Sequence, residues 1–270
     1  MAEGEGDRIR KRDRMKRYVR VPLALRTADL PKRAASAVVM LAVAGGALWL
    51  GEAWWAAFVL AVAFGVWFEW SVLAMLFTPP GARRLAWRAA GAVYCAIAAA
   101  VLILLRMDAT GTFWLLTVLC AVIMTDVGAY FSGRAIGGPK IAPSISPSKT
   151  WAGLGGGMVA SAATVVIAGR WGASLFPGTL ECARVGACAP SASHPSGGHL
   201  AASLAIGALI AVIAQAGDFF ESWMKRRAGV KDSGKLLPGH GGLFDRVDGL
   251  MAVLFLLGLV FMLSPVPGSL

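Results

Sequence analysis

Apolar residues dominate the chain in seven long runs that are separated by shorter polar stretches. The runs are Ala34–Leu50, Ala53–Phe77, Ala89–Leu105, Phe113–Phe131, Trp151–Ala168, Leu200–Gly217 and Gly249–Leu263. A helix rises about 1.5 Å per residue, so about 20 residues cross the roughly 30 Å hydrocarbon core of a bilayer. Each run therefore predicts a membrane-spanning helix, and the short last run is expected to start earlier. The pattern predicts an all-α fold, a polytopic membrane bundle of about seven spans, a number that short re-entrant helices would raise.

The composition agrees with that architecture. Of the 270 residues, 57% are apolar and only 15% are charged, and the mean hydropathy is +0.66. Soluble domains are about 45–50% apolar and about 25% charged, so an ordinary soluble domain is excluded. The charges are concentrated: residues 1–33 hold 11 Lys/Arg and 5 Asp/Glu, and residues 218–248 hold 6 and 5. We therefore divide the chain into a basic tail, residues 1–33, and a membrane-embedded domain, residues 34–270.

The net charge of +11 has two interpretations. The basic run in residues 8–20 is compatible with nucleic acid, but directly before an apolar segment it favours contact with anionic lipids at the cytoplasmic surface. With the N-terminus in the cytoplasm, 23 Lys/Arg lie on the inner side and 3 on the outer side. The positive-inside rule thus predicts a multi-pass protein of the cell membrane with its N-terminus in the cytoplasm. Because the basic run is assigned to lipid contact, no nucleic acid is expected as a partner.

Cysteine changes this picture little. Cys95 and Cys120 fall inside predicted spans, where cysteine is a small apolar packing residue. Cys182 and Cys188 fall in a predicted outer loop, where a disulfide is left open.

A first polar segment, residues 125–157, lies on the predicted cytoplasmic side. Asp126 falls within an apolar span, where a carboxylate is costly and indicates function; an Asp that reaches out to the helix end is the alternative. The Gly- and Pro-rich loop that follows offers Lys140, Ser146, Lys149 and Thr150. Cations and hydroxyl groups on such a backbone are typical of phosphate binding, although many loops of this composition have no ligand.

The second polar segment, residues 215–249, combines carboxylates with cations. One helical face, with i, i+3, i+4, i+7 spacing, carries Asp218, Glu221, Ser222 and Lys225. A tight turn follows at residues 238–242, and then Asp245 and Asp248 share a second helical face. Three aspartates are therefore expected near the cytoplasmic surface of the membrane.

Carboxylates in that number suit Mg²⁺, which binds through one or two carboxylates together with substrate phosphates. Zinc is disfavoured, because His240 is the only nearby nitrogen ligand and no cysteine accompanies it. The structural alternative is a set of salt bridges that cap two helices, such as Asp218 with Lys225 and Asp245 with Arg246.

The stretch from Ser222 to Asp248 resembles the motif of the phosphatidate cytidylyltransferases, also called CDP-diacylglycerol synthases. It contains Ser, Lys-Arg, Lys-Asp, an apolar residue with Pro, His-Gly-Gly and Asp-Arg-x-Asp at that family's spacing. Residues 126–130 and 146–151 are also similar to the family, except that Ser148 stands where a Lys is usual. The resemblance covers residues 33–263. It implies transfer of a cytidylyl group from CTP to phosphatidic acid, giving CDP-diacylglycerol and pyrophosphate in phospholipid biosynthesis.

The resemblance and the residue chemistry together assign expected roles. Asp218 and Asp245 are the expected principal Mg²⁺ ligands, with Asp248 and Asp126 in support. The expected catalytic residues are Asp218, Lys225, Asp245 and Asp248. The expected substrate-binding residues are Lys140, Ser146, Lys149, Thr150, Ser222, Arg226, Lys231, His240, Gly241, Gly242 and Arg246. CTP, phosphatidic acid and membrane lipids are the expected partners; a second, monovalent cation and a homodimer are left open.

Two other classes of protein remain as alternatives. A CTP-dependent lipid kinase would use similar substrates but transfer the terminal phosphoryl group to a polyprenol-type alcohol. A transporter would use the intramembrane residues Asp126 and Glu69 as coupling sites. The charges gather at one predicted membrane face and not at the midplane, which disfavours a transporter. Glu69 itself is as compatible with an inward-facing structural role as with a functional one.

Overall fold

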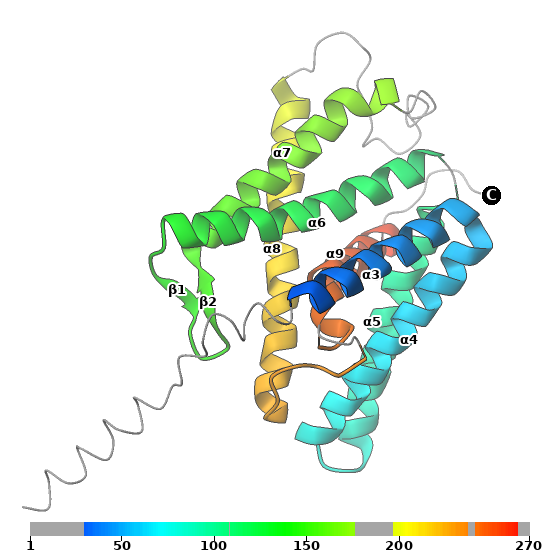
Figure 1. Ribbon diagram of the computed structural model, residues 1–270, viewed down its shortest axis with the longest axis vertical. Helices are drawn as coiled ribbons and strands as arrows, with labels where there is room; N and C mark the ends of the chain where they lie inside the picture. The colour runs from blue at the N-terminus through cyan, green and yellow to red at the C-terminus, as the bar shows by residue number, and fades with distance from the viewer. Residues whose placement is uncertain (1–29, 108, 176–196, 237–240, 264–270) are drawn as a thin grey trace, which may run out of the picture.

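The computed structural model describes residues 30–107, 109–175, 197–236 and 241–263, most of which are helical (Figure 1). In chain order, the helices are α3 (Leu30–Leu50), α4 (Glu52–Phe77), α5 (Ala82–Leu104), α6 (Ala109–Ala135), α7 (Trp151–Leu175), α8 (Gly197–Ala228) and α9 (Phe244–Leu263). A short antiparallel hairpin of β1 (Lys140–Ala142) and β2 (Ser146–Thr150) joins α6 to α7. The predicted helical bundle is confirmed, and the hairpin is an element that the apolar pattern did not predict.

Six of the helices, α4 to α9, are long and apolar enough to cross a membrane. The described apolar part of α3, Val38–Leu50, is shorter. Each of the seven predicted runs is helical, and several helices extend beyond their run because adjacent polar residues continue the turns. In particular, α8 reaches Ala228 and α9 begins at Phe244, as expected for the short last run. The chain is thus a multi-pass membrane protein, while seven spans remain a prediction.

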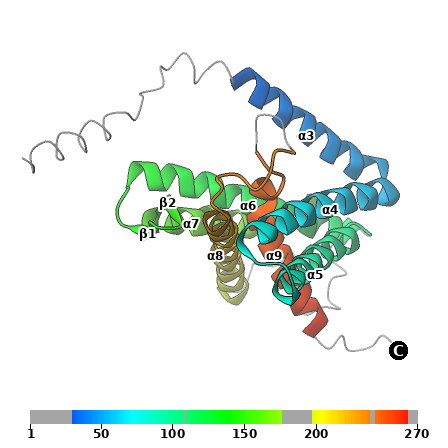
Figure 2. The same ribbon diagram turned by 90° about the horizontal axis from the view of Figure 1, so that it is seen from below.

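Helix α8 lies between the two halves of the bundle. On one side, α6 and α7 run next to each other, and both contact α8 (Figure 1). On the other side, α9 packs against both α8 and α5, and α5 packs against α4 (Figure 2). Helix α3 lies at the edge of the bundle against α4. Side chains on α8 are therefore able to meet groups from both halves.

Aromatic side chains fix the ends of α8 and α9 that carry the second polar segment. The Trp70 ring of α4 packs against Phe220 of α8, with centroids 5.4 Å apart, and against Phe244 of α9 at 5.8 Å. Trp223 of α8 packs against Trp87 of α5 at 6.0 Å. Rings of this size bury a large apolar area and have specific packing geometry. The packed rings therefore hold the polar segment in a fixed position.

Candidate functional site

Helices α8 and α9 approach each other closely where each carries an aspartate. A Cβ on Gly217 would lie only 2.6 Å from the backbone oxygen of Asp248, so the contact requires glycine. Asp218 follows this glycine directly, and its neighbours across the contact include Asp248. One carboxylate oxygen each from Asp218, Glu221 and Asp248 lies within 4.8 Å of the other two. We call these three residues the acidic cluster.

Glu221 is the most buried member of the acidic cluster. Its side chain is 0% exposed, and Lys225, one turn further along α8, pairs with its Oε2 atom. Its Oε1 atom is buried and receives no hydrogen bond from the part of the chain that the structure describes. A buried carboxylate oxygen without a donor carries a large desolvation cost. The cluster therefore has unused capacity to bind a cation.

Asp218 and Asp248 have few donors of their own. Asp218 forms an ion pair with Lys149 at the end of β2, and Ser222 Oγ lies 3.4 Å from its Oδ1. Asp248 accepts a hydrogen bond of 2.8 Å from the backbone N–H of Gly249. The pair formed by Lys149 joins the hairpin to α8, so the two polar segments of the sequence meet here as one site.

Asp245 lies beside the acidic cluster in a different environment. Its Oδ2 atom accepts the backbone N–H groups of Ser233 and Gly242, both at 2.9 Å. Its Oδ1 atom lies 2.7 Å from Lys225 Nζ. Both oxygens of this carboxylate are thus bonded to protein donors. The metal-binding role expected for Asp245 stays a prediction, whereas Glu221, outside the expected ligand set, completes the cluster.

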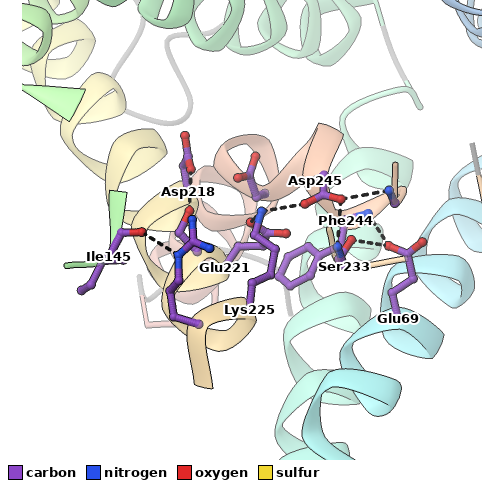
Figure 3. A network of polar contacts seen from close by, with 12 residues as sticks. Glu69, Ile145, Asp218, Glu221, Lys225, Ser233, Phe244 and Asp245 are labelled. Atoms are coloured by element: carbon purple, nitrogen blue, oxygen red, sulfur yellow. Dashed lines mark hydrogen bonds and ion pairs between the residues drawn. The ribbon is translucent and has the colours of Figure 1, made fainter. Parts of the chain in front are cut away.

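Lys225 joins the two groups of carboxylates. Its ammonium group lies between Glu221 on its own helix and Asp245 on α9, and its side chain is 14% exposed. Figure 3 shows these side chains in a row that runs from Asp218 to Glu69. The expected catalytic residues Asp218, Lys225, Asp245 and Asp248 therefore do lie together. For the two aspartates named in the structural alternative, the structure gives ion pairs of Asp218 with Lys149 and of Asp245 with Lys225. The pair of Asp245 with Arg246 stays a prediction.

A cavity of about 390 Å³ opens on the hairpin side of the site. Asp126 and Arg134 of α6, Lys149 of β2 and Gln215 of α8 contribute to its walls. Gln215 is buried, and its Oε1 atom has no hydrogen-bond partner in the described residues. Asp126 thus lies in the site, on a wall next to the Lys149–Asp218 pair. Arg134 and Lys149 place cations in its walls, which suits a phosphate-bearing ligand.

One backbone contact joins the hairpin to the end of α8, and a second lies within the hairpin. Arg226 Nε donates a hydrogen bond of 3.3 Å to the backbone oxygen of Ile145, and this contact is visible in Figure 3. Within the hairpin, Lys140 Nζ donates to the backbone oxygen of Ser148 at 3.4 Å. Both cationic side chains are exposed, so both remain accessible to a ligand.

The hydroxyl groups of the hairpin have local roles. Thr150 Oγ1 accepts the backbone N–H of Gly153 at 3.0 Å, which is the side-chain cap expected at the start of α7. Ser146 is buried at the start of β2. These two residues shape the site from its edge; their contact with substrate stays a prediction.

The loop between α8 and α9 carries the remaining expected residues. Lys231 and Arg246 are exposed, and His240 lies outside the described residues. Gly241 has a φ angle of 86°, a backbone conformation that favours glycine. A Cβ on Gly242 would collide with the side chain of Ser233. The Gly-Gly pair is therefore needed for the turn itself.

Three residues of the site lie outside the set of catalytic, binding and metal-ligating residues expected from the sequence. Glu221 shares a helical face with Asp218, a spacing that could have identified it. Glu69 is a carboxylate inside an apolar run, which is unusual. The sequence did not show where in the fold its side chain lies. Gln215 gave no signal beyond its position one turn before Asp218. Only Glu69 is brought to the site by tertiary packing alone.

The fold and the site define a class of protein. It is a multi-pass membrane protein in which carboxylates and lysines lie together where several helices end. A model of the cytidylyltransferase family matches residues 72–264, well over half of the chain. The chain belongs to this family, which confirms the resemblance found in its motifs.

Curated relatives include proteins named phosphatidate cytidylyltransferase from several bacteria. The protein of Brucella suis biovar 1 is 45% identical over 187 residues, which are 68% of this chain and 61% of that protein. The Haemophilus influenzae protein is 38% identical over 142 residues, 53% of this chain and 43% of its own length. That of Pseudomonas aeruginosa is 35% identical over 153 residues, 57% and 49%. The chain thus spans less than two thirds of the length of these relatives.

Proposed function

We propose that the protein is a phosphatidate cytidylyltransferase, which transfers the cytidylyl group of CTP to phosphatidate and releases pyrophosphate. The similar proteins from Brucella suis and Haemophilus influenzae have this name. The observation that carries the proposal is the acidic cluster with Lys149 and Lys225 paired to its members. Two polyanionic substrates repel each other, so such a reaction depends on positioning and on stabilisation of charge. The site provides both kinds of charge at one place.

The chemistry of the acidic cluster fits Mg²⁺ as a cofactor. Its three carboxylates are hard oxygen ligands that converge within 4.8 Å, and Glu221 Oε1 is buried without a donor among the described residues. Asp218, Glu221 and Asp248 would hold the ion, and Asp126 on the adjoining cavity wall is a supporting residue. Bound Mg²⁺ would supply charge neutralisation to the substrate phosphates and to the leaving pyrophosphate.

Lys149 and Lys225 are the proposed phosphate-binding cations. An ammonium group has three N–H donors, so a lysine paired with one or two carboxylates keeps a donor for a phosphate oxygen. Lys149 is paired with Asp218, and Lys225 is paired with Glu221 and Asp245. Both ammonium groups are therefore already held in the site before a substrate binds. Arg226 and Lys140 extend this cationic surface along the hairpin.

The proposed reaction needs little general-base catalysis. A phosphate oxygen of phosphatidate is already anionic and attacks the α-phosphorus of CTP. The bond from that phosphorus to the bridging oxygen of the β-phosphate breaks, and pyrophosphate leaves with the electron pair. The chain's own task is to hold the two phosphates in line and to shield their charges.

We further propose that the site faces the cytoplasm at the cell membrane. The distribution of 23 Lys/Arg on one side and 3 on the other supports an N-terminus inside, with α3 as a seventh span. On this topology, the hairpin, the end of α8 and the start of α9 meet at the inner surface. The substrate CTP is then available from the cytoplasm and phosphatidate from the membrane.

The test is product identification with the purified full chain in detergent micelles that contain phosphatidate and Mg²⁺. CTP is labelled in one sample at the α-phosphate and in another at the γ-phosphate. We expect the α label in the lipid fraction and the γ label in pyrophosphate. A γ label in the lipid would indicate a lipid kinase, and an absence of nucleotide consumption would contradict the proposed enzyme.

A further inference from the structure

Glu69 is a buried carboxylate that the proposed reaction does not yet use. It lies in α4 between Phe68 and Trp70, three residues before the family match begins. Its side chain is only 2% exposed. A carboxylate in such a position is costly unless several donors satisfy it, and its presence in an apolar helix indicates a specific role.

Three donors from a distant part of the chain meet the Glu69 carboxylate. Ser233 Oγ donates to Oε2 at 2.7 Å, and the backbone N–H of Phe244 donates to the same atom at 2.9 Å. The backbone N–H of Leu243 donates to Oε1 at 3.0 Å. The first N–H groups of a helix have no partner within the helix and carry partial positive charge. Glu69 therefore caps the start of α9 from another helix.

The loop is shaped to receive this carboxylate. A Cβ added to Gly234 would collide with the Glu69 side chain, and one added to Gly242 would collide with both Glu69 and Ser233. Backbone of the loop therefore lies directly against the carboxylate. Such a contact allows little displacement of the loop while the Glu69 hydrogen bonds are in place.

A continuous series of contacts leads from Glu69 to the acidic cluster. Ser233, held by Glu69 through its hydroxyl group, donates its own backbone N–H to Asp245 Oδ2 at 2.9 Å. Asp245 Oδ1 lies 2.7 Å from Lys225 Nζ, and Lys225 pairs with Glu221 (Figure 3). A shift of Ser233 would move Asp245, and with it the ammonium group that faces the cluster.

We propose that Glu69 is a positioning residue: it fixes Ser233 and the start of α9 so that Asp245 holds Lys225 against the acidic cluster. The inference rests on the proposed cytidylyltransferase function, because it assigns a part in that reaction to a residue remote from the cluster. Glu69 acts through Asp245 and Lys225, and its own oxygens are bonded to the loop. Its loss should therefore affect turnover more than substrate affinity.

The kinetic test compares Glu69→Gln, Glu69→Asp and the control Glu52→Gln, an exposed carboxylate at the other end of the same helix. In Glu69→Gln an amide N–H faces backbone N–H donors, so we expect kcat to fall by about 10- to 100-fold. KM for CTP should change by less than about threefold. Glu69→Asp keeps the charge and should recover part of the loss. A kcat within about twofold of the wild type in Glu69→Gln would overturn the proposal.

A second readout does not depend on turnover. Hydrogen–deuterium exchange of the full chain in detergent should show faster exchange at Ser233, Leu243 and Phe244 in Glu69→Gln, with no change in α7. If Glu69→Gln does not fold, Ser233→Ala removes one of the three hydrogen bonds and should give the same pattern to a smaller extent. Unchanged exchange at these amides in the folded variant would overturn the proposal. A wild type without cytidylyl transfer would refute the proposed function, while the exchange data would still test the Glu69 contact with the loop.

Discussion

The acidic cluster and the pair formed by Glu69 and Asp245 are two neighbouring sets of carboxylates that differ in how many hydrogen bonds their oxygens accept. Glu69 and Asp245 receive five hydrogen bonds from the loop and the start of α9, four of them from backbone N–H groups. Within the part of the chain that the structure describes, Glu221 of the acidic cluster has an oxygen without a donor, and Asp248 accepts one backbone hydrogen bond. Glu69 and Asp245 therefore stabilise the loop and the start of α9, whereas the acidic cluster has capacity left for a ligand.

The difference shows that residue type and spacing do not decide the role of a carboxylate. Asp245 and Asp248 lie on the same face of α9, one turn apart. Asp245 is at the first turn, where loop N–H groups are available, and Asp248 is one turn deeper, where it faces Asp218 and Glu221. A carboxylate with several nearby donors, such as Asp245, anchors the loop, whereas one with few donors, such as Asp248, is a candidate metal ligand. Variants of each kind should therefore have different consequences.

The largest effect is expected from the acidic cluster itself. Asp218→Asn and Glu221→Gln keep the side-chain volume but remove the negative charge that a cation requires. We expect kcat to fall by about 100- to 1000-fold in each variant, measured as CTP-dependent formation of a lipid product. Glu52→Gln is the matched control, since that carboxylate is exposed and distant in sequence from the site. Near-normal turnover in Asp218→Asn would show that the metal assignment is wrong.

Lys225 connects the two sets, so Lys225→Met should damage both. It leaves Glu221 and Asp245 without their shared cation, and loss of one partner of a buried ion pair costs about 3–5 kcal/mol. We expect a clearly lower midpoint of thermal unfolding in detergent together with loss of turnover. Lys235→Met, at an exposed lysine of the loop that follows α8, is the control. An unchanged midpoint would indicate that Lys225 does not link the two sets.

Gly242→Ala perturbs the loop between α8 and α9, which Glu69 holds in place, without removing any charge. The new Cβ would collide with Ser233 and Glu69, and overpacking of this kind costs about 1–3 kcal/mol. We expect lower thermal stability and turnover reduced by about tenfold. Gly155→Ala in α7 is the control, because a Cβ there meets nothing within 4 Å. Equal behaviour of the two variants would contradict the tight contact between loop and carboxylate.

The smallest effect is expected at the edge of the site. Lys140 is exposed and bonded only weakly to Ser148 within the hairpin, so its charge is screened by water. Lys140→Ala should raise KM for CTP by about two- to threefold, and added salt should reduce the difference from the wild type. A change as large as that of Lys149→Ala would mean that Lys140 lies closer to the phosphates than the hairpin suggests.

The helices could be predicted from the sequence because a membrane span requires a long apolar run, and every predicted run became a helix. The ends could not be placed, since the charged stretch after Gly217 continues α8 to Ala228. The hairpin was missed because its second strand, which contains Pro147, has no apolar alternation. For the site, Asp218, Lys225 and Asp248 follow from local spacing. Glu69 joins them only because α4 packs beside the loop.

Metal binding by matched variants tests the division between the two sets most directly. Mn²⁺, observed by electron paramagnetic resonance in the absence of nucleotide, reports on the site without turnover. We predict that Glu221→Gln weakens Mn²⁺ binding by about tenfold or more, whereas Asp245→Asn changes it by less than about threefold. Equal loss of Mn²⁺ in both variants would contradict the account, because Asp245 would then be a ligand and not an anchor.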